Sequence, residues 1–232
     1  MNTFETPSGE AGGAAARGAV VAVNVLFEVR DTDRPGHPTG IDKRPVSGDV
    51  AVGELGVAGD RQVDQVHHGG PDRAVYAYAA EDLDWWAAQL DRRLTPGLFG
   101  ENLTLAGVDV TGAIIGERWL VGGNLLLEVT MPRTPCYKFA HRMGEKRWIR
   151  RFNEAGMPGA YLRVLAEGPI SEGDEVVVVR RPDHGVTLGD TFPEPRPEPM
   201  ARLLAAADDG EVRLAQPMRE RAEHGARQLS GS

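Results

Sequence analysis

The chemistry available to this chain centres on one thiol. Cys136 is the only cysteine in 232 residues and stands in the stretch TMPRTPCYKF, residues 130–139. From residue 131 to 152 there are seven Lys and Arg side chains and one acid, so this segment carries +6 (7 − 1) within a chain of net charge −8. Nearby cations stabilise a thiolate, so we expect a depressed pKa at Cys136 and reactivity toward electrophiles or soft metals. The residues alone leave an inert, buried cysteine about equally open.

A second candidate is the turn HHGGPDR. Gly69 and Gly70 allow backbone amides to converge on one anion. His68 and Arg73 can add donors, and Asp72 can orient one of them. For a glycine pair taken alone, a tight turn with surface histidines is the favoured interpretation.

Two shorter motifs carry weaker signals. In FGENL, Gly100 permits close backbone approach, while Glu101 and Asn102 offer an acceptor and a mixed donor–acceptor. In GIDKRPV, Lys43 and Arg44 follow a glycine-rich stretch, and their residue types favour two solvated surface charges. No paired-cysteine zinc pattern, Walker loop, dinucleotide fingerprint or serine-hydrolase elbow is present, so those chemistries have no support.

The elements that must position these residues are mostly short strands. β-branched, apolar runs predict strands at 18–29, 123–130, 160–165 and 174–180. A helix is predicted from Glu81, with Leu83, Trp86 and Leu90 at helical spacing. Many strands with few helices favour a mostly β fold, a closed β-barrel with interrupting helices.

A second helix is predicted over EKRWIRRF, residues 145–152, with Trp148, Ile149 and Phe152 on one face and Gly156 at its end. Residues 1–18 are expected to form a flexible tail and 19–181 the barrel domain.

Residues 182–232 are expected to hold the extended proline-rich linker FPEPRPEP and a small helical appendage that is ordered or partly mobile. MARLLAAAD within it is weakly amphipathic, and PMRERAEHGARQ is polar nearly all round. No secretory signal, internal disulfide or membrane span is encoded, which favours a cytoplasmic protein without a membrane partner. The net charge of −8 argues against a nucleic-acid partner.

Taken in order, these motifs resemble the MOSC domain family (molybdenum cofactor sulfurase C-terminal domain), in its bacterial single-domain YiiM-like branch. The likeness lies in GVAGDRQVDQVHHGGPDRAVYAY (56–78), LFGENLT (98–104), LLLEVTMPRTPCYKF (125–139) and GMPGAYLRVLAEGPISEGD (156–174). It covers roughly residues 19–181. The polar second helix of the appendage departs from this branch.

The resemblance implies a β-barrel that binds the molybdenum cofactor (molybdopterin), with Cys136 as the metal-ligating or sulfur-carrying residue. It implies a pocket formed by Lys43, His68, Gly69, Gly70, Arg73, Asn102, Arg133, Tyr137 and Lys138. His68, Lys43 and Tyr137 are the candidate proton donors. The family is also associated with pyridoxal phosphate binding. A purified sample can lack the labile molybdopterin.

By the same resemblance, the expected activity is reduction of N-hydroxylated compounds, including base analogues, to amines, with electrons from a separate reductase partner. A persulfide carrier on Cys136 and a non-catalytic cofactor-binding module are the two alternatives. The sequence leaves a monomer and a homodimer equally open.

Overall fold

The structure is a computed structural model that describes residues 16–34, 36–63 and 69–227. In chain order its elements are β1 (Arg17–Arg30), β2 (Thr39–Val46), β3 (Val50–Gly53), β4 (Gly56–Val57), η1 (Pro71–Arg73), β5 (Val75–Ala79), α2 (Ala80–Leu90), β6 (Leu103–Ala106), β7 (Arg118–Val121), β8 (Leu125–Pro132), α3 (Tyr137–Met143), α4 (Trp148–Ala155), β9 (Ala160–Ala166), β10 (Gly168–Ile170), β11 (Glu175–Arg180), η2 (Gly189–Thr191), α5 (Pro197–Asp208) and α6 (Gln216–Ala226).

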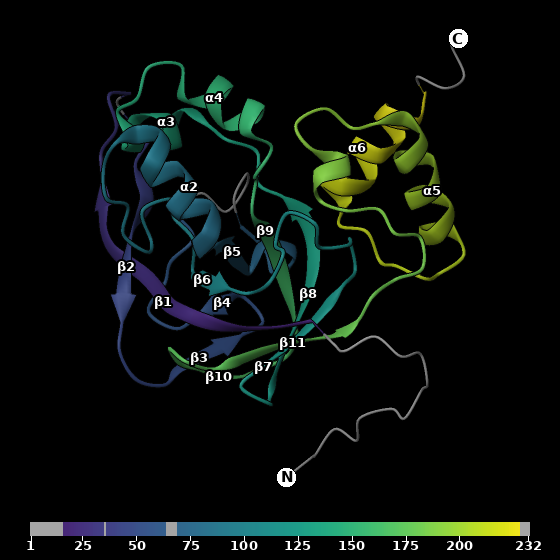
Figure 1. The fold of residues 1–232 in the computed structure, drawn as a ribbon, viewed down its shortest axis with the longest axis horizontal. Helices are drawn as coiled ribbons and strands as arrows, with labels where there is room; N and C mark the ends of the chain where they lie inside the picture. The colour runs from purple at the N-terminus through teal and green to yellow at the C-terminus, as the bar shows by residue number, and fades with distance from the viewer. Residues whose placement is uncertain (1–15, 35, 64–68, 228–232) are drawn as a thin grey trace.

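Seven strands close into a barrel, which confirms the predicted fold class. Their order is β11-β7-β8-β9-β5-β6-β1, and β1 pairs again with β11 to complete the ring. The 14-residue β1 also carries β2 on its outer side, so β1 pairs with three strands. Strands β5 and β6 run parallel, while the other barrel pairs are antiparallel. A small sheet of β10, β3 and β4 lies at one end of the barrel (Figure 1).

Burial on both faces explains why the sequence of β5 is a continuous run of apolar and aromatic residues. All five residues of its sequence VYAYA are buried, because β5 pairs with β9 and β6 and α2 packs against it. A strand covered on both faces has no exposed side to mark with polar residues.

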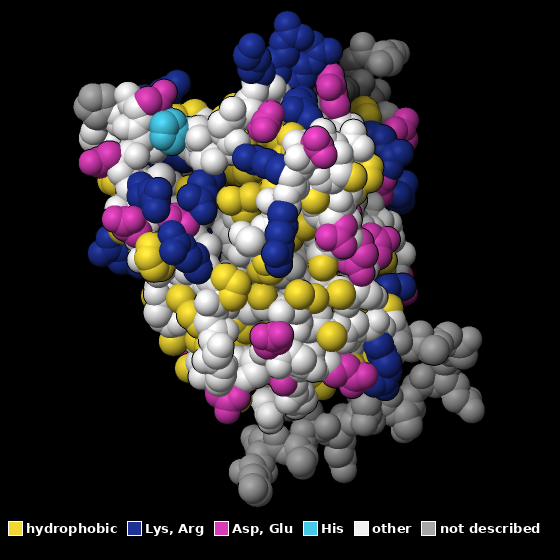
Figure 2. Space-filling model, turned by 60° about the vertical axis from the view of Figure 1, so that its left-hand side comes forward, with side chains coloured by type: hydrophobic (Ala, Val, Ile, Leu, Met, Phe, Trp, Pro, Cys, Tyr) yellow, Lys and Arg dark blue, Asp and Glu magenta, His cyan; other side chains and the backbone are white. Residues whose placement is uncertain are grey.

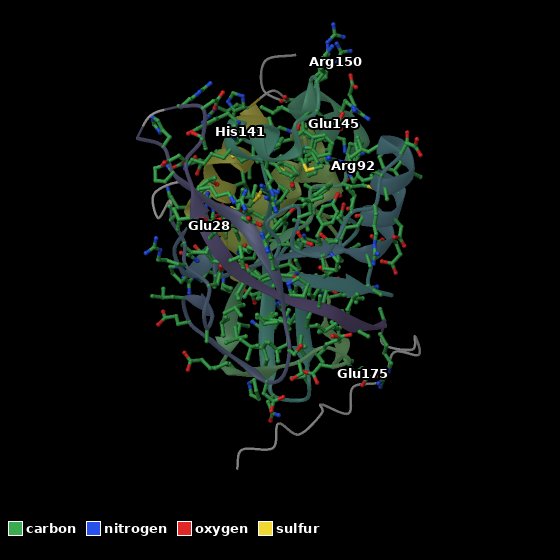
Figure 3. The ribbon with its side chains drawn as sticks, turned by 90° about the vertical axis from the view of Figure 1, so that its left-hand side faces the viewer. Glu28, Arg92, His141, Glu145, Arg150 and Glu175 are labelled. Atoms are coloured by element: carbon green, nitrogen blue, oxygen red, sulfur yellow. The ribbon has the colours of Figure 1, made fainter. Side chains whose placement is uncertain are left out.

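Helices α2, α3 and α4 cover the opposite end of the barrel (Figure 1). They contribute to a cluster of aromatic rings. Trp86 lies 4.6 Å from Trp148 between ring centroids, and Phe99 lies 5.1 Å from Phe139. Figure 3 shows Arg92 and Glu145 at this helical end, with Glu175 at the other.

The predicted α4 face needs one correction. Trp148 and Phe152 are buried, as expected, but Ile149 is 38% exposed. Adjacent helical residues point about 100° apart, so Ile149 cannot share the face of Trp148. Gly156 ends the helix in the left-handed conformation at φ 71°, as predicted.

The C-terminal appendage also differs from expectation. The stretch FPEPRPEP is not wholly an extended linker, because α5 begins within it at Pro197. Proline is well suited to the first helical turn, where no intrahelical N–H donor is required. The polar α6 still buries Met218, Ala222 and Gly225, and Met218 and Ala222 belong to the same core cluster as the barrel.

Candidate functional site

A cavity of about 110 Å³ lies beside the turn that precedes β5 and the loop that follows β8. It brings together five of the residues predicted from sequence and one thiol. Its lining includes Lys43, Asp60, Gln62, Arg73, Tyr76, Asn102, Arg133, Cys136, Lys138 and Tyr161.

Asp60 is the hub of the polar network in this cavity, and the sequence analysis missed it. Its Oδ2 atom lies 2.7 Å from Lys43 Nζ and accepts a hydrogen bond of 2.7 Å from Asn102 Nδ2. Its Oδ1 atom accepts the backbone N–H of Leu26 at 3.0 Å. One buried carboxylate therefore ties β1, β2 and the loop before β6 together.

Lys43 is buried at the cavity wall, contrary to the solvated surface charge that its residue type favours. Burial lowers the pKa of Lys43, and the charge of Asp60 opposes that change. Its neighbour Arg44 remains half-exposed over the ring of Phe27. The two adjacent cations thus have different environments because β2 turns successive side chains to opposite faces.

Arg133 is the buried cation at the end of β8. It donates a 2.6 Å hydrogen bond to the carbonyl of Phe99, and its guanidinium lies 3.9 Å from the ring centroid of Phe139. Burial acts to lower the pKa of Arg133, but electrostatic interaction with Tyr76, Tyr161 and Cys136 raises it overall. Arg133 therefore supplies a fixed positive charge close to the thiol.

Glu101 organises the FGENL loop from within. Its two carboxylate oxygens accept the backbone N–H groups of Gly97 at 2.6 Å and Phe99 at 3.0 Å. Burial raises the pKa of Glu101. The carboxylate holds the loop that presents Asn102, and Glu101 does not itself line the cavity.

Cys136 precedes α3 and is half-buried. It lines the cavity together with Lys138, so the thiol opens onto the same space as the cations. Tyr137, between them, is not among the lining residues. Its ring packs under Arg34, whose guanidinium lies 4.2 Å from the ring centroid.

The HHGGPDR turn places one of its residues at the cavity. Arg73 lines the cavity, while His68 lies outside the described residues. The amide of Gly70 is already engaged, because it donates a 2.9 Å hydrogen bond to Gln62 Oε1. Gly70 has a φ of 92°, which suits a residue without a side chain. The predicted anion nest therefore cannot use the Gly70 amide in this conformation.

Asp72 pairs with a neighbour that the sequence did not indicate. Its Oδ1 atom lies 3.1 Å from Arg163 Nη2, and its carbonyl accepts a 2.7 Å hydrogen bond from Thr130. Arg163 also donates to the carbonyl of Arg213 in the appendage at 3.1 Å. A buried arginine therefore connects the turn that carries Arg73 to the C-terminal helices.

The face drawn in Figure 2 carries more Lys and Arg side chains on its upper half than on its lower half, with Asp and Glu side chains interspersed among them.

This barrel and its cavity are those of a MOSC domain: residues 64–177 match that family, and the chain belongs to it. The uncharacterized protein YflK of Bacillus subtilis (strain 168) is 38% identical over 150 residues, which cover 65% of this chain and 67% of YflK. Protein YiiM of Escherichia coli (strain K12) is 32% identical over 151 residues, or 63% of this chain and 66% of YiiM.

Solved structures agree with this assignment to the YiiM-like branch. YiiM from Geobacillus stearothermophilus superposes with a TM-score of 0.72 at 27% identity, covering 90% of this chain and 99% of that one. YiiM from Escherichia coli gives a TM-score of 0.67 at 25% identity, with 93% and 94% covered.

A protein named "Reductase" from Gibberella moniliformis (strain M3125 / FGSC 7600) is 33% identical over 145 residues. The match covers 61% of this chain but 26% of the fungal protein.

The part of the chain that the structure describes holds no helix with the length and apolarity needed to cross a membrane. Within the same ranges, no three His, Cys, Asp or Glu side chains gather as a metal site.

Proposed function

We propose that this protein binds the molybdenum cofactor in the cavity beside Cys136 and reduces N-hydroxylated compounds to amines. The observation that carries the proposal is the opening of the thiol onto a cavity that Lys43, Arg73, Arg133 and Lys138 also line.

The residues present fit such a cofactor. Molybdopterin brings two sulfur ligands and a phosphate, so the protein needs to add one soft ligand and a set of cations. Cys136 is the soft ligand, and the four cations are suited to the phosphate. In the ranges that the structure covers, no group of protein carboxylates and histidines competes for a metal there. A single thiol is therefore sufficient.

When bound, the cofactor would supply the two-electron chemistry that breaks an N–O bond. The balanced half-reaction is R–NHOH + 2 e⁻ + 2 H⁺ → R–NH₂ + H₂O. Lys43 is suited to hold one proton at Nζ, because burial lowers its pKa and Asp60 keeps the ammonium in place at 2.7 Å. Arg133 stabilises negative charge near Cys136 without exchanging a proton.

The fungal relative supports an oxidoreductase role, since it is named "Reductase" and shares 145 aligned residues with this chain. We propose that electrons reach the site from a separate donor protein, because no motif in this sequence indicates a dinucleotide or other electron-carrying cofactor.

The test compares the wild type with Cys136→Ser, both from a host that makes the cofactor. We expect near-stoichiometric molybdenum by mass spectrometry in the wild type, and reduction of phenylhydroxylamine with a reduced viologen dye as electron donor. Cys136→Ser should lose both the metal and the activity, because a hydroxyl is a poor soft ligand. The control Arg150→Ala, at an exposed position on α4, should retain both.

Two other outcomes would replace the proposal. Little molybdenum together with a mass increment on Cys136 that dithiothreitol reverses indicates a persulfide carrier. Cofactor binding that survives Cys136→Ser without turnover of any N-hydroxylated substrate indicates a non-catalytic binding module.

A further inference from the structure

A second cavity, of about 210 Å³, lies at the seam between the barrel and α6. We call it the seam cavity. Its floor is formed by Met131 and Tyr161 from the barrel and Met218 from α6, all buried. Its rim includes Pro217, which is exposed. The cavity therefore opens to solvent on the side of the appendage.

The seam cavity is the direct neighbour of the cavity beside Cys136. Arg73 and Tyr161 line both. The Arg73 guanidinium lies 6.0 Å from the centroid of the Tyr161 ring, so the two side chains form one partition between the spaces. A molecule in the seam cavity would have one end at this partition.

The lining is cationic at two places and carries no carboxylate among the described residues. Arg221 is held in position because it donates to the carbonyls of Thr191, at 2.7 Å, and of Pro193. Burial lowers the pKa of Arg221, and the charge of Glu194 opposes that change. A guanidinium anchored on neutral carbonyls keeps its charge available for an anionic ligand.

The remaining lining favours a flat ring. Two thioethers and the face of Tyr161 form an apolar floor of polarizable groups, which pack well against aromatic rings. The combination of an apolar floor with cations at its ends disfavours cationic ligands and favours aromatic anions.

We infer that the seam cavity is the substrate subsite, and that it selects flat N-hydroxylated compounds carrying an anionic group. This inference rests on the proposed function. The anionic group lies toward Arg221, and the N–O group is directed past Arg73 and Tyr161 toward the cavity of Cys136.

Binding can be measured without turnover. Calorimetry on the full chain compares 4-aminobenzoate with aniline, the amines that would be released from the matched hydroxylamines. We expect at least about tenfold tighter binding of 4-aminobenzoate, as for one hydrogen bond to a charged group. Arg221→Gln should abolish this preference. Pro217→Trp should weaken both ligands by covering the rim, and the exposed control Glu223→Trp on the same helix should change neither.

Turnover gives the second readout. For the molybdenum-loaded enzyme we expect 4-(hydroxyamino)benzoate to have a KM about tenfold below that of phenylhydroxylamine, a difference that Arg221→Gln removes. Thermal melts would show that Pro217→Trp, at an exposed position, remains folded.

The outcomes separate the two proposals. A loaded wild type that reduces neither hydroxylamine overturns the proposed function, while calorimetry still decides the subsite. If the wild type binds 4-aminobenzoate and aniline with equal affinity, and Pro217→Trp weakens neither, the subsite alone is overturned. If Arg221→Gln loses molybdenum and loses activity equally with both hydroxylamines, the subsite is overturned, because Arg221 then contacts the cofactor.

Discussion

At the scale of single residues, the environment of Asp82 in the first turn of α2 disfavours its ionised carboxylate. Burial, together with Asp109 and Glu81, raises its pKa from 3.8 to about 6. The folded state therefore binds this proton more tightly than the unfolded state does. Ionisation of Asp82 lowers stability progressively as the pH rises from 3.8 to 6, and the loss is complete above 6.

We predict that Asp82→Asn raises the free energy of unfolding at pH 7.5 by about 1 kcal/mol, after allowance for solvent screening. The gain should be smaller at pH 4.5, where much of the wild-type carboxyl is protonated. Urea titrations at both pH values measure it. Asp84→Asn, an exposed position on the same helix, removes the same charge and should show no such pH-dependent gain.

The residue scale also shows what the sequence could reveal of the site. Arg133, Cys136 and Lys138 lie close together in the chain, so their positive field is visible as a run of letters. Asp60 has no such signal, because its partners Lys43 and Asn102 are 17 and 42 positions away. A single acid in a glycine-rich turn becomes recognisable only when the barrel brings those strands together.

At the scale of elements, α2 provides a matched pair of tryptophans. Trp86 is 1% exposed, contacts the aromatic cluster and donates a 3.1 Å hydrogen bond to the Tyr78 hydroxyl. Its neighbour Trp85 is 44% exposed.

We predict that Trp86→Ala lowers the free energy of unfolding by about 4 kcal/mol, because it leaves a large cavity and removes one of the two hydrogen bonds of the Tyr78 hydroxyl. Trp85→Ala should cost less than about 1 kcal/mol. Guanidinium unfolding of the two variants makes the comparison. Similar losses would mean that α2 does not pack through the face that the 3.6-residue period indicates.

Arg163 on β9 is the element-scale link between the site and the appendage. We predict that Arg163→Ala lowers the free energy of unfolding by about 3 kcal/mol, because Asp72 and Glu128 lose a buried partner. On the proposed function, the molybdenum content of this variant should also fall, since the turn that carries Arg73 loses its anchor.

Denaturant unfolding and metal analysis on the same preparation test this link. Arg213→Ala is the control, because that side chain is 75% exposed and lies 3.9 Å from Asp72. Arg150→Ala is a second control. Arg150 projects outward from α4 (Figure 3), so its removal should alter neither the free energy of unfolding nor the molybdenum content.

The strands and helices were predictable to within a few residues wherever a period was strong, as in α2 and β11. The proline-rich stretch was not, since proline favours an extended chain and a first helical turn equally well. Tertiary contacts decide between them here, because Arg221 binds the carbonyls that precede α5.

At the scale of the whole molecule, the barrel and the appendage share one hydrophobic core. Val212 lies against Gly116, and Arg180 donates a 2.7 Å hydrogen bond to the carbonyl of Glu211. The stretch 192–199 therefore connects two parts of one core, and Arg221 donates a hydrogen bond to the carbonyl of Pro193 within it.

We predict that brief trypsin digestion leaves the Arg202–Leu203 bond of α5 uncut in the native protein, because cleavage needs local unfolding of a helix whose preceding segment Arg221 holds. Arg221→Gln should make the site susceptible, and mass spectrometry of the fragments identifies the cut. Rapid cleavage of the wild type at this position would show that the appendage opens independently.

The pairing of β1 with three strands also affects the order in which the barrel forms. During synthesis the start of β1 must wait for β11, one of the last barrel strands, since Arg17 pairs with Val177. Until then this short part of β1 is an edge open to other chains, while β2 and β6 pair with the rest of the strand. Closure of the ring joins residues 160 positions apart (177 − 17), and contacts of such long range form slowly.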